Sequence, residues 1–148
     1  MNHDEMMTLA LDEARRALEH NDVPVGALCV IDDRVLASRH NEKELRKDAT
    51  CHAEILAIRD ALSMIGDKYL TGVTVYTTLE PCVMCAGALV TVRCERVVFG
   101  AFDPKSGAAS SLYNLCCDPR LNAEVAVVAG VQQEACSRIL KEFFATKR

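Results

Sequence analysis

Two short segments, Cys51–Glu54 and Pro81–Cys85, constrain the fold of this chain more than any other feature of its sequence. They are separated by 26 residues, and between them they supply His52, Cys82 and Cys85. One imidazole and two thiolates form a ligand set suited to Zn²⁺, and no fourth protein ligand is evident. Three ligands with an open position are typical of a catalytic zinc site. The fold must therefore bring the two segments to one point.

The spacing inside each segment predicts where two helices begin. In a helix that starts at Pro81, Cys82 and Cys85 lie on one face about 60° apart, and the helix dipole there favours thiolates. His52 and Glu54 are two positions apart, which separates them by about 200° inside a helix, so they converge only at a helix end. We expect both in the first turn of a helix that faces the Cys82 helix end to end.

Glu54 is the candidate proton carrier beside this metal. A zinc-bound water has its pKa lowered to about 7, and an adjacent carboxylate can take the proton and later return it. Weaker alternatives are a redox pair or half of a structural zinc site made by the two cysteines, and a structural site closed by Cys51. Glu80 is the rival carboxylate. Because a residue before proline favours extended backbone, we expect Glu80 to end a strand.

Size, charge and cysteine spacing limit the class of protein. A chain of 148 residues that is 50% hydrophobic fits one domain, 1–148, with a sizeable core. The net charge of −4 argues against a nonspecific nucleic-acid binder held by bulk charge. The cysteines lack the dense spacing of a small secreted scaffold, the N-terminal segment is acidic, and no apolar run approaches membrane-spanning length. We expect a soluble, cytoplasmic protein without a membrane partner.

Hydrophobic periodicity predicts an α/β fold. Helices are expected over 2–20, 52–65, 82–92 and 131–143, and strands over an apolar run ending at 31 and over 35–38, 73–77, 96–100 and 123–129. The segment 39–50 is expected to be a loop, and 101–118 a loop with a short helix at 111–115. These elements predict a single sheet covered by helices on both faces. The helix over 82–92 is apolar on nearly every side, so we expect it to be buried.

Three single residues carry more local expectations. His3 and His20 stand at the ends of the first helix and are expected to be solvated. Gly26 lies in the first strand, where it marks either a close backbone approach suited to a ligand pocket or a bulge.

Asn41 lies in the polar loop. Its amide presents a donor and an acceptor together, which suits a base edge, although an asparagine here is more often a turn residue.

With both motifs described, the chain resembles the cytidine deaminase-like superfamily and, within it, the bacterial tRNA-specific adenosine deaminases. The metal motifs are shared by all base and nucleoside deaminases of the superfamily. The segment Asp103–Ser110 and the Val83-Met84 pair between the cysteines indicate the tRNA branch. Further similar segments cover nearly the whole chain, namely 23–27, Asn41 with its distance to His52, 97–101 and 143–144.

The resemblance implies a three-layer α/β/α fold with a single mixed five-stranded sheet whose last two strands are parallel. It also implies a homodimer with one Zn²⁺ per subunit, which hydrolyses the wobble adenosine of an arginine tRNA to inosine. The base would be flipped out of a splayed anticodon loop. Asn41 would hold the purine. The other substrate-binding residues implied in this way are Val25, Ala53, Phe102, Asp103, Lys105 and Ser106.

The chain departs from the family pattern at Ala49, Cys51 and Phe102. Phe102 would either stack on a base or cap the core. In the closing helix we expect Phe143 in the core, whereas Phe144 lies off the apolar stripe and is open to contact with RNA or a second subunit. Basic residues of the loop and of the C-terminal tail would form a phosphate track: Arg39, Lys43, Arg46, Lys47, Arg138, Lys141, Lys147 and Arg148.

Two other functions remain open at this point. A deaminase of free guanine, cytosine or a nucleotide would use the same metal site and explains the acidic pI of about 5.6 more simply. It leaves the segment Asp103–Ser110 unexplained. A non-catalytic zinc subunit is the third possibility, and Glu54 argues against it, because a subunit without turnover needs no proton carrier.

Overall fold

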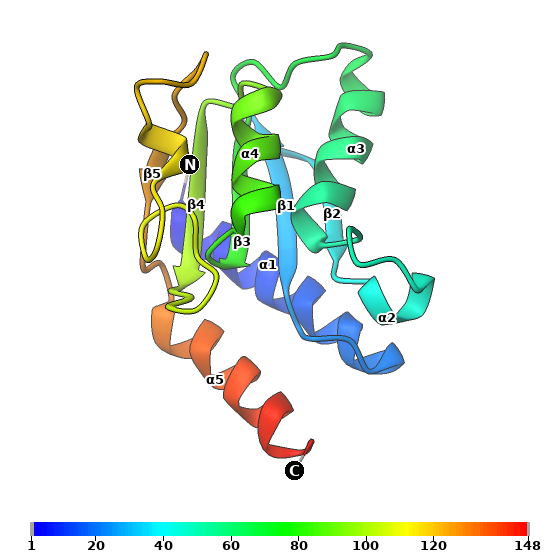
Figure 1. Ribbon diagram of the computed structural model, residues 1–148. Coiled ribbons are helices and arrows are strands. Elements are labelled where there is room, and N and C mark those ends of the chain that lie inside the picture. The colour runs from blue at the N-terminus through cyan, green and yellow to red at the C-terminus, as the bar shows by residue number, and fades with distance from the viewer. Residues whose placement is uncertain (1, 148) are drawn as a thin grey trace.

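A five-stranded sheet forms the centre of the computed structural model, which describes residues 2–147 (Figure 1). The strand order is β2-β1-β3-β4-β5; β1 pairs antiparallel with β2 and β3, and the pairs β3–β4 and β4–β5 are parallel. This confirms the mixed sheet that the family resemblance implied. Arg148, the end of the predicted basic tail, lies outside the described residues. The strands are β1 Gly26–Ile31, β2 Arg34–His40, β3 Thr74–Leu79, β4 Arg96–Ala101 and β5 Ala126–Val128.

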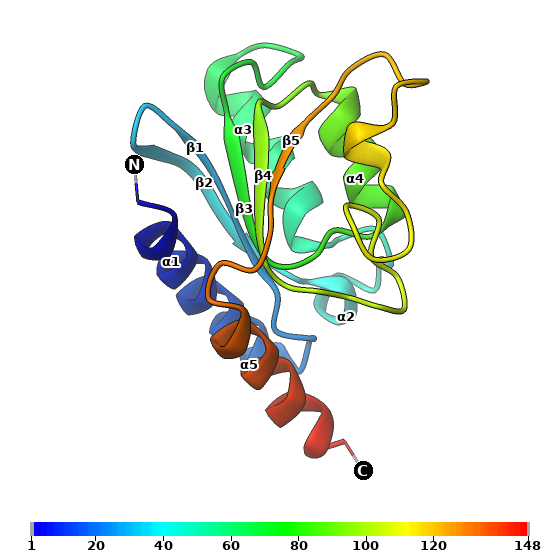
Figure 2. The same ribbon diagram turned by 90° about the vertical axis from the view of Figure 1, so that its left-hand side faces the viewer.

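Helices cover both faces of the sheet. Figure 2 shows α1 and α5 on one face and α3 and α4 on the other. The helices are α1 His3–Arg16, continued by a 3₁₀ turn at Ala17–His20, then α2 Lys43–Arg46, α3 Ala53–Ile65, α4 Val83–Thr91 and α5 Gln133–Ala145. Within residues 2–147, none of these helices combines the length and apolar character needed to cross a membrane.

The alternation of strand side chains divides the interior into two cores. Val75 and Val97 face the core under α3 and α4, whereas Tyr76 and Val98 face the core under α1 and α5. Successive residues of a strand point to opposite faces, so each of the two central strands supplies both cores. All four side chains are fully buried.

Gly26 marks the place where α1 crosses β1. A Cβ atom at this position would lie 2.0 Å from the carbonyl oxygen of Ala10 and 2.6 Å from the amide nitrogen of Ala14. The irregularity between β1 and β2 lies elsewhere, between Cys29 and Val30. The expected close backbone approach at Gly26 is therefore confirmed, but it serves the packing of a helix on the sheet and not a ligand pocket, and the bulge interpretation is wrong.

The polar segment expected to be a loop contains the short helix α2. Its first turn is capped from a distance, because Asp22 accepts hydrogen bonds from the backbone N–H groups of Glu44 and Leu45 at 2.6 and 3.1 Å. Because Asp22 lies 22 residues before Glu44, local sequence patterns do not predict this cap.

Two further local expectations are corrected. The predicted short helix at 111–115 is instead a 3₁₀ turn at Leu115–Cys117. The helix over 82–92 begins two residues later than Pro81 suggested, at Val83 with Cys82 as N-cap. It is not buried on all sides, since Val83 is 50% exposed.

Candidate metal and catalytic site

The metal-binding residues stand at two helix N-termini that meet at one end of the sheet. His52 is the N-cap of α3 and Cys82 the N-cap of α4, both with extended backbone. Figure 1 shows α3 and α4 running side by side with their N-termini at the same end, so the predicted end-to-end arrangement is wrong. Glu54 and Cys85 lie within the first turns, as their spacing predicts.

The three predicted ligand side chains converge on one point. The Sγ atoms of Cys82 and Cys85 lie 3.6 and 3.5 Å from Nδ1 of His52. Zinc bond lengths of about 2.3 Å to sulfur and 2.0–2.1 Å to nitrogen, at tetrahedral angles, place such atoms about 3.6 Å apart. The residues therefore fit a zinc ion. Among residues 2–147, this is the one group of three or more histidines, cysteines or carboxylates whose ligand atoms all lie within 4.8 Å of one another.

Cys51 does not join this cluster. Its thiol is buried, and burial together with a hydrogen bond to Asp48 raises its pKa. The reading in which Cys51 closes a structural site thus has no support in the geometry.

The two thiols of the cluster have different pKa values, because the hydrogen bond with Cys82 and burial raise the pKa of Cys85. A hydrogen bond from Cys85 lowers the pKa of the Cys82 thiol to about 4, so Cys82 is a thiolate at neutral pH. The hydrogen bond to Cys82 in turn raises the pKa of His52. A thiolate is the form in which cysteine binds a metal.

Glu54 is buried beside these ligands, with only 4% of its surface exposed. Burial disfavours the ionised form and raises the pKa of its carboxyl to about 7. A group with such a pKa can accept and release a proton near neutral pH. The geometry thus provides a metal-binding cluster with an adjacent proton carrier.

Glu80 has a role that the sequence did not reveal. It follows β3 directly and is only 2% exposed. Its carboxylate accepts hydrogen bonds from the backbone N–H groups of Asp103 at 3.0 Å, Ala109 at 3.2 Å, and Ser110 and Ser111 at 2.8 Å each. The hydroxyl of Ser111 donates a fifth. Glu80 is therefore the anchor of the segment after β4.

The same segment is held against the start of the cysteine motif. Gly107 forms an isolated antiparallel bridge with Cys82, and the N–H of Ala108 donates to the carbonyl of Pro81 at 2.9 Å. A Cβ atom at Gly107 would lie 2.4 Å from the carboxyl carbon of Glu80. One sequence pattern could have predicted this anchor: a glutamate directly before the Pro-Cys pair, together with a later run of small residues. The backbone N–H groups of such a run can surround a carboxylate and donate hydrogen bonds to it.

Four of the predicted substrate-binding residues line one cavity of about 400 Å³. Phe102 is 39% exposed there and also contacts Phe99 edge-on with ring centroids 5.1 Å apart, so it both caps the core and faces the cavity. Phe144, 52% exposed, lies on the same wall. The complete lining is Val23, Leu79, Phe102, Asp103, Lys105, Ser106, Leu140 and Phe144.

Asn41 lies in a neighbouring cavity of about 390 Å³ that shares Val23 with the first. The amide is 7% exposed; its Nδ2 donates to the carbonyl of Val23 at 3.2 Å, and its Oδ1 accepts from the N–H of Lys43 at 3.1 Å. Val25 and Ala53 are buried in the core instead, at 8% and 0% exposure. Phe143 lines the Asn41 cavity and is only partly buried.

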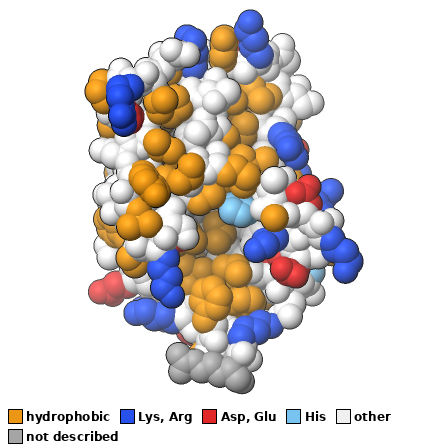
Figure 3. All heavy atoms as spheres, in the orientation of Figure 1, with side chains coloured by type: hydrophobic (Ala, Val, Ile, Leu, Met, Phe, Trp, Pro, Cys, Tyr) orange, Lys and Arg blue, Asp and Glu red, His pale blue; other side chains and the backbone are white. Residues whose placement is uncertain are grey.

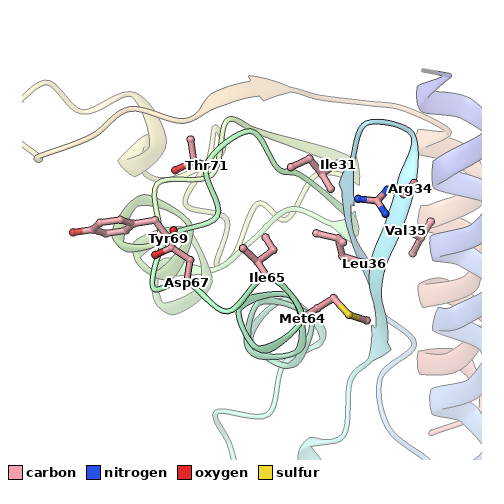
Figure 4. A pocket seen from close by; sticks show the side chains of 9 residues that line it. All are labelled: Ile31, Arg34, Val35, Leu36, Met64, Ile65, Asp67, Tyr69 and Thr71. Carbon is pink, nitrogen blue, oxygen red and sulfur yellow. The ribbon is translucent and has the colours of Figure 1, made fainter.

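The surface around the helix N-termini is hollowed. Figure 3 shows, on the face that carries α4, a recess with hydrophobic side chains and a histidine at its border and lysine and arginine side chains around it. A separate cavity of about 470 Å³ lies at the other end of the sheet, between the β1–β2 hairpin and the C-terminal end of α3 (Figure 4). None of the predicted site residues lines it: Ile31, Arg34, Val35, Leu36, Met64, Ile65, Asp67, Tyr69 and Thr71.

Comparison with known proteins gives concordant results. The family model described as MafB19-like deaminase matches residues 1–148. The tRNA-specific adenosine deaminase of Bacillus subtilis (strain 168) is 46% identical over 149 residues, covering 100% of this chain and 92% of the relative.

Two solved structures are similar. One, from studies of A-to-I editing by tRNA:A34 deaminases at the wobble position of transfer RNA, is 42% identical, covers 90% of this chain and 97% of its own, and has a TM-score of 0.87. A guanine deaminase from Bacillus subtilis is 34% identical, covers 69% of this chain and 66% of its own, and has a TM-score of 0.65.

Proposed function

The chain belongs to the MafB19-like deaminase family, and from this premise we propose that it deaminates adenosine to inosine at the wobble position of a tRNA, an arginine tRNA in particular. The observation that carries the proposal is the convergence of His52, Cys82 and Cys85 beside the buried Glu54. The relative with 46% identity over the full length supports the choice of substrate class.

The proposed reaction replaces the exocyclic amine of adenine by oxygen, so water and adenosine give inosine and ammonia. His52, Cys82 and Cys85 would hold one Zn²⁺ per subunit, which supplies Lewis acidity for the activation of water. Glu54 then moves protons. Its carboxylate takes a proton from the attacking water, delivers it to a ring nitrogen, and passes the next to the departing amine. The pKa of about 7 suits a group that must work in both directions.

Asn41 is proposed to hold the purine. An amide carries two N–H donors and two acceptor lone pairs. One donor bonds the carbonyl of Val23 and one lone pair accepts from Lys43, so bonding capacity remains for a base edge. The two bonds fix the orientation of the amide, which is the condition for specific recognition.

Lysines of α2 and of the C-terminal tail are proposed to contact RNA phosphates. Lys43 of α2 and Lys147 line the Asn41 cavity together, which supports a track joining the polar loop to the C-terminal tail. Arg39 and Arg46 are paired with Glu42, and Arg39 also with Asp60, so they are less suited to the task. We expect affinity for RNA to fall steeply with salt, and affinity equal at low and high salt would contradict the track.

A homodimer is proposed from the exposed apolar surface beside the site. Val83 of α4 is 50% exposed, and Leu112 and Tyr113 of the following loop are 53% and 55% exposed. Figure 3 shows hydrophobic side chains spread over this face. Light scattering after gel filtration should give twice the chain mass of 16.2 kDa.

The decisive experiment compares RNA with free bases. Zinc-loaded protein is incubated with an arginine-tRNA anticodon stem-loop carrying adenosine at the wobble position, and in parallel with free adenosine, guanine, cytosine and cytidine, and both inosine and ammonia are measured. The same stem-loop with guanosine at that position is the matched control. Inosine in the adenosine stem-loop alone is expected.

Ammonia from free guanine would overturn the substrate while leaving the metal assignment intact. That outcome has one specific observation in its favour, the 34% identity to a guanine deaminase.

A further inference from the structure

Two histidines on the opposite face of the sheet from α3 meet ring to ring. His20 ends the 3₁₀ turn after α1, and His40 ends β2. Their Nε2 atoms lie 3.1 Å apart, and their side chains are 15% and 13% exposed. The sequence-based expectation that His20 is solvated is therefore wrong. The expectation for His3 is also wrong, since His3 hydrogen-bonds the hydroxyl of Tyr76 at 2.8 Å.

The other nitrogen of each ring is held by a buried carboxylate. Nδ1 of His20 contacts Oδ2 of Asp22 at 2.6 Å, and Nδ1 of His40 contacts Oε2 of Glu13. An ionised carboxylate can only accept, so each Nδ1 carries the ring's hydrogen. The lone pairs of the two Nε2 atoms then face each other, so the contact has to be bridged by a shared proton or by a metal ion.

This arrangement has the features of a pair of metal ligands. A histidine that binds a metal through one nitrogen almost always donates its other N–H to a carboxylate, carbonyl or water, which fixes the ring. Two imidazoles bound at about 2.0–2.1 Å to one ion in tetrahedral geometry have nitrogens about 3.3 Å apart. The observed 3.1 Å between His20 and His40 is close to that distance.

A third carboxylate, that of Glu42, lies beside His40. Oε2 of Glu42 lies 3.6 Å from Nε2 of His40, while Oε1 of Glu42 is occupied by Arg39 and Arg46. Glu13, Asp22 and Glu42 thus place three buried carboxylates around the two rings. Arginine side chains contact only the oxygens that point away from the rings, at Glu42 and, through Arg16, at Oε1 of Glu13.

We propose that His20 and His40 bind a second divalent transition-metal ion, with Asp22 and Glu13 orienting the rings. Imidazole ligands suit zinc or nickel. The site shares no residue with the His52 cluster and goes beyond the proposed deamination. Its ion joins the 3₁₀ turn to the end of β2.

The position of the site gives it an effect on substrate binding. His40 directly precedes Asn41, and Asp22 caps α2 through Glu44 and Leu45. His20 and Asp22 also line the Asn41 cavity. An ion bound here therefore fixes the walls of the cavity in which Asn41 is proposed to hold the purine.

The test counts metal ions per chain. Untagged protein is equilibrated by dialysis against micromolar zinc and analysed by plasma mass spectrometry. We expect two zinc ions per chain in the unchanged protein and one in His20→Gln and His40→Gln, whose amides still donate to the carboxylates. His3→Gln, at a half-buried histidine outside the site, should retain two. Even if His40→Gln does not fold, His20→Gln at the end of a turn answers the question.

One ion per chain in the unchanged protein overturns the proposal and leaves a shared proton between the rings. Two ions that persist in His20→Gln also overturn it, because the second ion then binds elsewhere. Cobalt(II) gives an independent readout. The cluster with two thiolates produces intense charge-transfer absorption in the near ultraviolet, whereas the histidine site adds only weak visible bands, and these bands should vanish in the two variants.

The number of metal ions bound per chain does not depend on whether the protein deaminates RNA. A protein that binds two ions and deaminates no RNA would keep this inference and reject the function.

Discussion

Glu54 and Glu80 are two buried glutamates whose pKa values are shifted in opposite directions. Glu54 is 4% exposed, and burial raises its pKa to about 7. Glu80 is 2% exposed, and burial alone would raise its pKa too, but the hydrogen bonds from Ser111 and from the backbone of the loop outweigh it and lower the pKa. Burial raises the free energy of an ionised carboxylate, and hydrogen-bond donors lower it. The number of donors therefore decides whether the buried carboxyl group stays ionised. One carboxyl is suited to move a proton, the other to hold a loop.

The largest difference between the roles of Glu54 and Glu80 should appear when the metal is removed. The proposed proton transfer by Glu54 is useful only beside the ion, whereas the five hydrogen bonds of Glu80 need no metal. We expect chelator-treated protein to lose all measurable inosine formation and to regain it with Zn²⁺, while the loop 103–111 stays resistant to proteolysis. Turnover that persists in protein shown to be metal-free would contradict the assignment.

Glu54→Gln should reduce turnover by roughly 10²–10⁴-fold, the usual contribution of a general acid–base group. Zinc content should not change, because Glu54 is not a ligand. The free energy of unfolding should not fall, since a neutral amide replaces a carboxyl whose charge is disfavoured by burial. Single-turnover kinetics, metal analysis and denaturant titration check the three statements. Glu5→Gln, at an exposed position in the first turn of α1, is the control. A Glu54→Gln variant with full activity would remove Glu54 from its role.

Glu80→Gln should show the reverse pattern. Its amide group would point N–H at backbone N–H donors, which should cost roughly 3 kcal/mol of unfolding free energy. Because the loop carries Asp103, Lys105 and Ser106, KM for the RNA should rise more than kcat falls. Denaturant titration and steady-state kinetics measure both. Glu80→Asp, which keeps the charge, should recover part of the loss. Unchanged stability in Glu80→Gln would show that the loop does not depend on this carboxylate.

Ser111→Ala should have the smallest effect, about 1 kcal/mol, because it removes one of five donors to Glu80. Ser110 offers a matched control. Its backbone N–H bonds Glu80 at 2.8 Å, and that bond survives in Ser110→Ala. Thermal unfolding of the two variants side by side should therefore lower the midpoint only for Ser111→Ala. Equal midpoints would mean that the hydroxyl of Ser111 adds nothing to the anchor.

The sequence predicted the Glu54 region well because its parts are close together along the chain. His52 and Glu54 occupy one helical turn, and Cys82 and Cys85 another, so spacing alone indicates convergence within each pair. The helices and strands followed from periodicity in the same way. That the sheet is mixed, with its last two strands parallel, came only from the family resemblance, and the order of the strands was not predicted, because strand pairing is a tertiary property that periodicity does not contain.

The features that were missed depend on partners far apart in sequence. The donors to Glu80 come 23 to 31 residues later, and the cap of α2 comes from Asp22. His20 was expected in solvent because nothing near it reveals His40, which is 20 residues away. Gly26 indicated a close approach, yet only the structure identifies the approaching group as the backbone of Ala10.

The presence of Lys147 in the Asn41 cavity has a practical consequence for protein production. A purification tag or fusion partner joined after the last residue would emerge at the mouth of the proposed RNA site. Asn2, by contrast, caps the far end of α1, whose 14 residues span about 21 Å. Extensions should therefore be placed before Asn2 and removed before assay, since a string of tag histidines at either end would also bind the very ions that are to be counted.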